Sequence, residues 1–245
     1  MRQSLAASLV LAMAACGEPA VEPALGPKSA ERAQAKAVVP APTSRCSTPS
    51  GVSGSPTTIS AAVGLINALP KPVSAACFVE SLNRPLALVA TASPFSAQPA
   101  NDSHSPRIFI RNGTLTMVVV PGGMGRNLLE FGEATAEGSS LKGELELPIV
   151  DTLTEAAPLD RVQAGKGTTC GTCHDDEAPA ASGAGFISEV LIPLPEFEVT
   201  VAELQRDASR CGADDNERCD LLRALFDHGD VGAGTLQSGG RLCHG

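Results

Sequence analysis

The amino-acid sequence predicts an α+β fold, in which an antiparallel β meander or sandwich is combined with a few short helices. The meander is predicted for residues 107–150, where four strand-like segments follow one another. Residues 107–111 alternate as a half-buried strand does, and Asn112-Gly113 is a strong hairpin signal because both turn positions need a positive φ. Outside this range, apolar residues at a spacing of three to four predict helices.

The segments before the meander predict one helix and a mixed stretch. Residues 58–69 predict a helix, because apolar side chains recur on one face and Pro70 and Pro72 follow. Residues 77–90 predict a helical turn and then a strand, with a break at Arg84-Pro85.

The meander is followed by strand-like and helical segments. A strand is predicted within residues 185–193. Thr200 with Glu203 three positions later forms a capping box, and a second helix is predicted from Asp214 to Gly229. The four strands expected within the meander are residues 107–111, 114–120, 128–134 and 140–150.

The chain divides into a leader, a linker and a folded part. Residues 1–15 predict a signal peptide, and residues 16–45 an Ala- and Pro-rich tether that cannot bury a core. Residues 46–245 are expected to form a single α+β domain, with an inserted irregular segment at about 155–185.

The composition argues against nucleic acid as a partner. The chain has 18 Lys+Arg against 27 Asp+Glu, a formal net charge of −9, and so lacks a basic surface for phosphate. It has 7 Phe but no Trp and no Tyr, so platforms on which bases stack are not expected. No apolar run reaches the roughly 18 residues that a membrane-spanning helix needs.

The N-terminus has the pattern of a secretory signal, with Arg2, a short apolar stretch and small residues. The segment Met13-Ala14-Ala15-Cys16 resembles the lipobox of bacterial lipoproteins, in which the cysteine is lipidated and becomes the first residue. This resemblance implies a lipid anchor in a membrane at Cys16, and a place in the cell envelope, in the outer membrane or facing the periplasm. Ordinary signal cleavage, which leaves a soluble periplasmic protein, is the alternative.

The cysteines fit an oxidising compartment. The chain has 8 Cys, many for a cytosolic protein. Cys46 with Cys77, and Cys211 with Cys219, are candidate disulfides. If Cys16 carries lipid, an odd number of cysteines remains, and at least one is unpaired or bonded outside the chain.

One motif carries recognisable chemistry. Cys170-Gly171-Thr172-Cys173-His174 has the C-x-x-C-H spacing, in which two thiols can each add to a haem vinyl group and the histidine can ligate iron. With the preceding Gly165-Lys166-Gly167, it resembles the attachment site of c-type cytochromes. The resemblance implies one covalent haem c on Cys170 and Cys173, with His174 as the proximal ligand.

The second axial ligand is left open by the sequence. Small c-type cytochromes usually carry it downstream, often as a methionine, but no methionine follows His174. The candidates for a sixth ligand are His228, His244 and Met117. We expect the haem to lie on a mostly β scaffold, partly exposed, with five-coordinate or bis-histidine iron.

Two other roles for the motif stay open. Cys170 and Cys173 can form a plain disulfide, or they can bind a metal ion with His174 and with Cys243 or His244. The favoured function is electron transfer or haem-linked sensing with a redox partner protein, rather than enzymatic catalysis. The alternative is a disulfide-stabilised structural or binding lipoprotein without haem. A haem site needs an open apolar face above His174, which a purely structural bridge does not.

Overall fold

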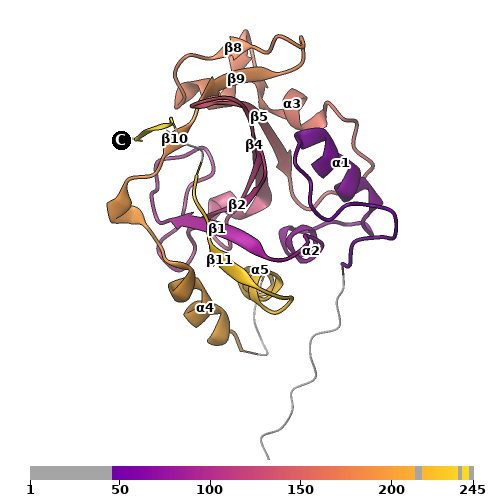
Figure 1. Cartoon of the computed structure of the whole chain (residues 1–245), viewed down its shortest axis with the longest axis vertical. Coiled ribbons are helices and arrows are strands. Elements are labelled where there is room, and N and C mark those ends of the chain that lie inside the picture. The colour runs from indigo at the N-terminus through magenta and orange to yellow at the C-terminus, as the bar shows by residue number, and fades with distance from the viewer. Residues whose placement is uncertain (1–45, 213–216, 237–238, 243–245) are drawn as a thin grey trace, which may run out of the picture. The chain divides into compact units, whose positions relative to one another are not determined.

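An eight-stranded sheet is the centre of the computed structural model, which describes residues 46–212, 217–236 and 239–242 (Figure 1). The strands in spatial order are β11 (Val231–Ala233), β1 (Leu86–Thr91), β2 (Arg107–Asn112), β3 (Leu115–Val119), β4 (Leu128–Ala136), β5 (Ser139–Glu146), β9 (Phe186–Glu189) and β8 (Ala178–Pro179). All neighbours pair antiparallel except β1 and β11, which are parallel. The sheet with its short helices is the expected α+β fold.

The remaining elements are short. The helices are α1 (Ile59–Ala68), α2 (Ala75–Glu80), α3 (Ala157–Val162), α4 (Val201–Ser209) and α5 (Glu217–Phe226). The 3-10 turns are η1 (Met124–Asn127), η2 (Thr169–Thr172) and η3 (Pro195–Phe197). Two small sheets pair β6 (Gln163–Ala164) with β7 (Gly167–Thr168), and β10 (Leu191–Ile192) with β12 (Arg241–Leu242).

The predicted meander is present as β2 to β5. Gly113 turns the β2–β3 hairpin with a φ of 58°, but Asn112, expected to share the turn with a positive φ, has none and is the last residue of β2. The helix predicted over residues 58–69 is α1, whose N-cap Thr58 accepts from the Ala61 N–H. The predicted capping box of Thr200 and Glu203 opens α4. The signals that predict these elements come from residues close together in the sequence, so they could be located from the sequence alone.

Strand alternation gives the sheet two different faces. Ile110, Met117 and Phe131 are cross-strand neighbours on one face and belong to the buried core. Residues of α1, α2 and α5 complete this core, and α1 and α2 lie on the right of the sheet in Figure 1. The second layer is therefore helical rather than another sheet of a sandwich. The row on the other face includes Phe109 and Glu130, and it is covered by loops.

Two elements depart from the expected pattern. The segment expected to be irregular contains α3, and the Gly-rich tail contributes β11 to the sheet. The sequence Val-Gly-Ala has weak strand signals of its own, but the edge of β1 supplies its hydrogen-bond partners. Gly234 follows close to β1, where an added Cβ would lie 3.0 Å from the Ala87 carbonyl carbon.

Some predictions concern residues that the structure does not describe. The signal peptide, the tether, the lipidation of Cys16 and the start of the helix at Asp214 lie outside the described residues. Within the described ranges, no helix is long and apolar enough to cross a membrane. The described residues belong to one compact unit.

Both candidate disulfides are confirmed. Cys46 is bonded to Cys77, which ties the start of the described chain to α2. Cys211 is bonded to Cys219, which links the end of α4 to α5. The separations along the chain are 31 and 8 residues.

The longer loop predicts the larger contribution to stability, because closing it removes more entropy from the unfolded chain. We expect Cys46→Ala/Cys77→Ala to lower the free energy of unfolding by about 3–4 kcal/mol, and Cys211→Ala/Cys219→Ala by about 2–3 kcal/mol. Urea denaturation of both variants and the unchanged protein measures the difference. An equal loss in the two variants would contradict the loop-length argument.

Candidate functional site

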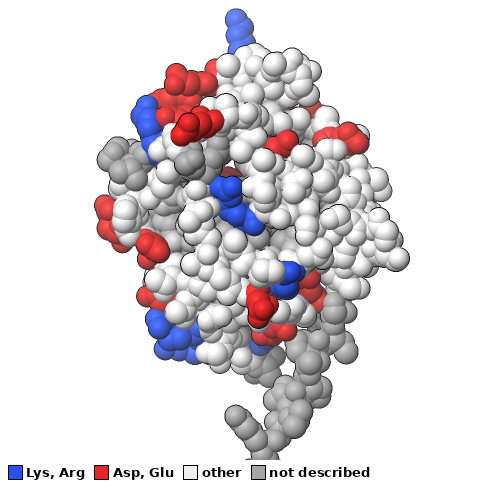
Figure 2. Space-filling view, in the orientation of Figure 1, with Lys and Arg blue, Asp and Glu red and all other residues white. Residues whose placement is uncertain are grey.

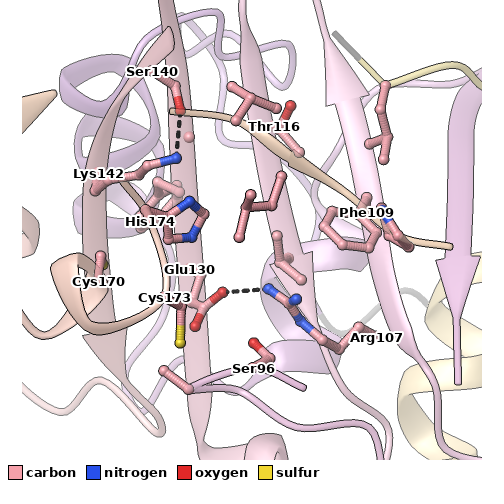
Figure 3. A pocket seen from close by; sticks show the side chains of 18 of the residues that line it. Ser96, Arg107, Phe109, Thr116, Glu130, Ser140, Lys142, Cys170, Cys173 and His174 are labelled. Atoms are coloured by element: carbon pink, nitrogen blue, oxygen red, sulfur yellow. Dashed lines mark hydrogen bonds and ion pairs between the residues drawn. The ribbon is translucent and has the colours of Figure 1, made fainter. Parts of the chain in front are cut away.

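A pocket opens on the loop-covered face of the sheet. Its empty volume is about 1120 Å³, a figure that includes space open to solvent. Strands β2 to β5 contribute its floor, with Arg107, Phe109, Val118, Glu130 and Lys142. The surrounding walls include Phe95, Ser96, Cys170, Cys173, His174 and Leu191 (Figure 3).

The C-x-x-C-H motif forms part of this wall. Cys170 lies in η2, Cys173 follows it, and both line the pocket together with His174. Both cysteines are free thiols, so the structure contains no disulfide between them. Figure 3 shows the two cysteines and the imidazole on the same side of the pocket. The motif predicted from sequence thus faces a cavity rather than the core.

Glu177 holds the turn that carries the two thiols. Its carboxylate accepts from the Thr168 backbone N–H at 2.7 Å and from the Thr168 hydroxyl. Thr168 Oγ1 in turn accepts from the backbone N–H groups of Cys170 at 3.1 Å and Gly171 at 3.3 Å. This network caps η2 and sets the direction of the motif.

The same carboxylate explains two glycines beside the motif. A Cβ at Gly167 would lie 2.2 Å from Glu177 Oε1, and one at Gly171 would lie 2.8 Å from it. Gly165 adopts a φ of 64° in the tight turn between β6 and β7. Gly167 before Cys170 and Gly171 after it therefore allow the chain to pass close to Glu177.

His174 is held by a single backbone acceptor. Its Nδ1 lies 2.7 Å from the Glu189 carbonyl oxygen, which places the proton on Nδ1 and leaves the Nε2 lone pair free. Burial, then the nearby Lys142 ammonium, lowers the pKa of the imidazole to about 4. His174 is therefore a neutral imidazole at neutral pH, the form that ligates a metal.

Lys142 shares the carbonyl group that orients His174. Its Nζ donates to Glu189 O at 3.2 Å and to Ser140 Oγ at 2.8 Å, both uncharged acceptors. Burial lowers the pKa of the ammonium to about 8, so most of it stays charged at neutral pH. The positive charge of Lys142 therefore lies near the His174 imidazole, and its hydrogen bonds go to Ser140 and Glu189 instead.

The environment of Cys170 keeps its thiol protonated. Burial raises the pKa of the thiol, against the opposing effect of a hydrogen bond with Thr168. The thiolate is the species that attacks a disulfide, so a protonated thiol exchanges slowly.

The candidates for a sixth ligand lie elsewhere. Met117 is fully buried in the core on the helical face, because alternation in β3 points it away from the pocket. His228 Nε2 lies 3.9 Å from Glu80 Oε1, and neither residue lines the pocket. The structure therefore does not bring Met117 or His228 to His174. His244 lies outside the described residues.

The alternative metal site gains no support. In the described part of the chain, no three His, Cys, Asp or Glu side chains are grouped so that they could hold a metal ion. The predicted site also needed Cys243 or His244, which the structure does not describe. A haem makes a smaller demand on the protein, because the porphyrin brings four nitrogen ligands to the iron and leaves only the axial positions to side chains.

Sequence reasoning missed the charged residues of the floor. Arg107 and Glu130 form an ion pair with 2.8 Å between Nη2 and Oε2, and both are mostly buried. Lys142 and Glu189 also surround the motif. Charges that alternate with apolar residues in a strand indicate a solvent-facing side, and nothing local says that loops will cover that side.

Comparison with known proteins adds no relative. No protein-family model, no curated protein and no solved structure matches the chain. The function proposed below therefore follows from the motif and from the geometry of the pocket.

We expect Glu177→Ala to loosen the turn of the motif, because Thr168 loses both of its acceptors there. Hydrogen exchange at the amides of Cys170 and Gly171 should accelerate about tenfold, the equivalent of one hydrogen bond. The exposed Glu196 of η3 provides the control variant, Glu196→Ala. Unchanged exchange in Glu177→Ala would show that the turn does not depend on this carboxylate.

The lowered pKa of His174 predicts that the stability of the haem-free protein depends on pH. Between pH 6.5 and about 4, His174 binds a proton in the unfolded chain but not in the folded one. The free energy of unfolding therefore falls as the pH falls. The loss should reach roughly 3 kcal/mol at pH 4. Denaturation across this range measures it, and His174→Gln should flatten the slope. An equally steep slope in that variant would assign the effect to other groups.

Proposed function

We propose that this chain is a cell-envelope protein that carries one covalent c-type haem, on Cys170 and Cys173 with His174 as the proximal ligand. The observation that carries the proposal is the meeting of two free thiols and a neutral imidazole on the wall of one pocket. Its role would be electron transfer or haem-linked sensing. The haem would supply a one-electron redox centre.

The residues present fit such a group. Phe109, Val118 and Leu191 provide apolar surface in the pocket, as a porphyrin needs. His174 presents a free Nε2, and its Nδ1–H is bonded to the Glu189 carbonyl oxygen. An outer hydrogen bond of this kind fixes the tautomer and the ring orientation of a metal-bound histidine. Glu189 is thus the positioning residue for the proximal ligand.

The two disulfides and the N-terminal segment support a location outside the cytoplasm. Two disulfides are typical of an oxidising compartment, which is also where bacterial haem attachment takes place. The lipobox-like segment at Cys16 adds an anchor in the membrane, and the tether would let the folded part reach a redox partner protein. Figure 2 shows charged side chains of both signs scattered among uncharged ones over one face of the molecule.

The test is an absorption spectrum with an intact mass, on protein produced together with haem-maturation machinery. We expect a Soret band and a mass increase of one haem that survives acid-acetone extraction. His174→Ala should abolish or strongly shift the band, because it removes the proximal nitrogen. His228→Ala is the matched control and should leave the spectrum unchanged.

The opposite result would favour a second function. If the protein shows no Soret band, its mass is short of two further hydrogens beyond the two disulfides, and an unreduced peptide map links Cys170 to Cys173, then these two residues form a bridge. The chain would then be a disulfide-stabilised structural or binding lipoprotein, and the pocket would take another ligand.

A further inference from the structure

A buried lysine lies beside the proposed proximal histidine. Lys142 of β5 is only 8% exposed, and its side chain extends toward Ser140 at the same end of the pocket as His174 (Figure 3). After burial, the Lys142 ammonium is the next largest cause of the lowered pKa of His174. The charge of the lysine therefore acts on the imidazole across a short distance.

Lys142 and His174 also share one hydrogen-bond acceptor. The Glu189 carbonyl oxygen lies 2.7 Å from His174 Nδ1 and 3.2 Å from Lys142 Nζ. A positively charged donor withdraws electron density from the oxygen, which makes this oxygen a weaker acceptor for the imidazole N–H. The Glu189 carboxylate takes no part in these bonds, because its Oε2 lies 3.5 Å from Arg241 Nη1.

The carboxylates that line the pocket have other partners than Lys142. Glu130 pairs with Arg107, with 2.8 Å between Oε2 and Nη2, and Glu144 pairs with Arg161, with 3.3 Å between Oε1 and Nε. The two acceptors of Lys142 Nζ are a hydroxyl and a carbonyl group, both uncharged. Solvent and salt screen a buried charge of this kind much less than a charge on the surface.

This arrangement bears on the oxidation of an iron held at His174 Nε2. Oxidation would add a positive charge to the site, and the Lys142 ammonium makes that addition less favourable. The weakened bond from Nδ1 to Glu189 also makes the imidazole a poorer electron donor, because an outer hydrogen bond raises the basicity of a ligating histidine. Both effects of Lys142 favour the reduced iron.

We propose that Lys142 raises the reduction potential of the site, through its buried charge and its share in the Glu189 carbonyl group. The inference rests on the proposed haem and adds to it a residue that regulates its electron affinity. Lys142 is a positioning residue and not a ligand, because it acts through His174 and through space. A raised potential makes the site a better acceptor of electrons from a redox partner.

The test is a spectroelectrochemical titration at pH 7 of the full chain with its haem attached. Lys142→Met keeps most of the length of the side chain and removes the charge. At a fixed applied potential, we expect the ratio of oxidised to reduced haem to rise about tenfold, which corresponds to a potential lower by about 59 mV for a one-electron couple. Lys142→Arg keeps the charge and should restore the potential of the unchanged protein.

Lys166→Met is the matched control, because it also removes one lysine charge close to the motif. Lys166 lies exposed in the turn between β6 and β7, where solvent and salt screen its charge. The ratio should change less than about twofold in this variant. Lys142→Gln is measured as well, because it keeps an N–H donor for the two buried acceptors, and it should lower the potential as Lys142→Met does.

A second readout needs no haem. In the haem-free chain, the Nδ1 proton of His174 is followed by nuclear magnetic resonance. Lys142→Met should move this resonance downfield, because the Glu189 carbonyl oxygen becomes a stronger acceptor when the ammonium is removed. Lys166→Met should leave the resonance in place.

The outcomes separate the role of Lys142 from the proposed function. An unchanged potential in Lys142→Met and Lys142→Gln, or an equal decrease in Lys166→Met, would overturn this role and leave the haem proposal standing. A decrease in Lys142→Arg as large as in Lys142→Met would overturn it too, since the charge is kept there. If the unchanged chain takes up no haem, the proposed function fails and this inference fails with it.

Discussion

The alternation of side chains along β2 to β5 is the constraint on which the rest of the structure depends. One row of cross-strand neighbours, including Ile110, Met117 and Phe131, is buried against the helices. The period of two then forces the adjacent row onto the opposite face. A shift of one residue in any strand would place charges in the core, so the register and the pocket are specified together.

The second face tolerates partial burial because its charged side chains have ion-pair or hydrogen-bond partners, although Arg107 Nε has none among the described residues. Arg107 is paired with Glu130, and Lys142 is bonded to a hydroxyl and a carbonyl. Burying an unpaired charge costs far more than burying one with partners, so the loops can cover this face only over such contacts. The result is a pocket whose floor combines charged side chains with the apolar Phe109 and Val118.

The motif segment completes this pocket through contacts distant in sequence. Glu177 holds the turn around Thr168, and the Glu189 carbonyl holds His174. Because β9 pairs with β5, the strand that carries Glu189 lies next to the strand that carries Lys142. The sheet itself therefore brings the cation, the carbonyl and the imidazole together.

The features that could be predicted have local sequence patterns. The features that could not be predicted depend on pairing between distant segments. The meander, α1, the capping box of α4 and both disulfides followed from spacing, since turns, caps and amphipathic periods involve neighbouring residues. The C-x-x-C-H motif was also recognised from its spacing, and the haem that it suggests stays a prediction. The position of β11 and the roles of Arg107 and Glu177 were not recognised. They arise from contacts between distant segments, which only the folded chain brings together because each partner alone has no local signal of the other.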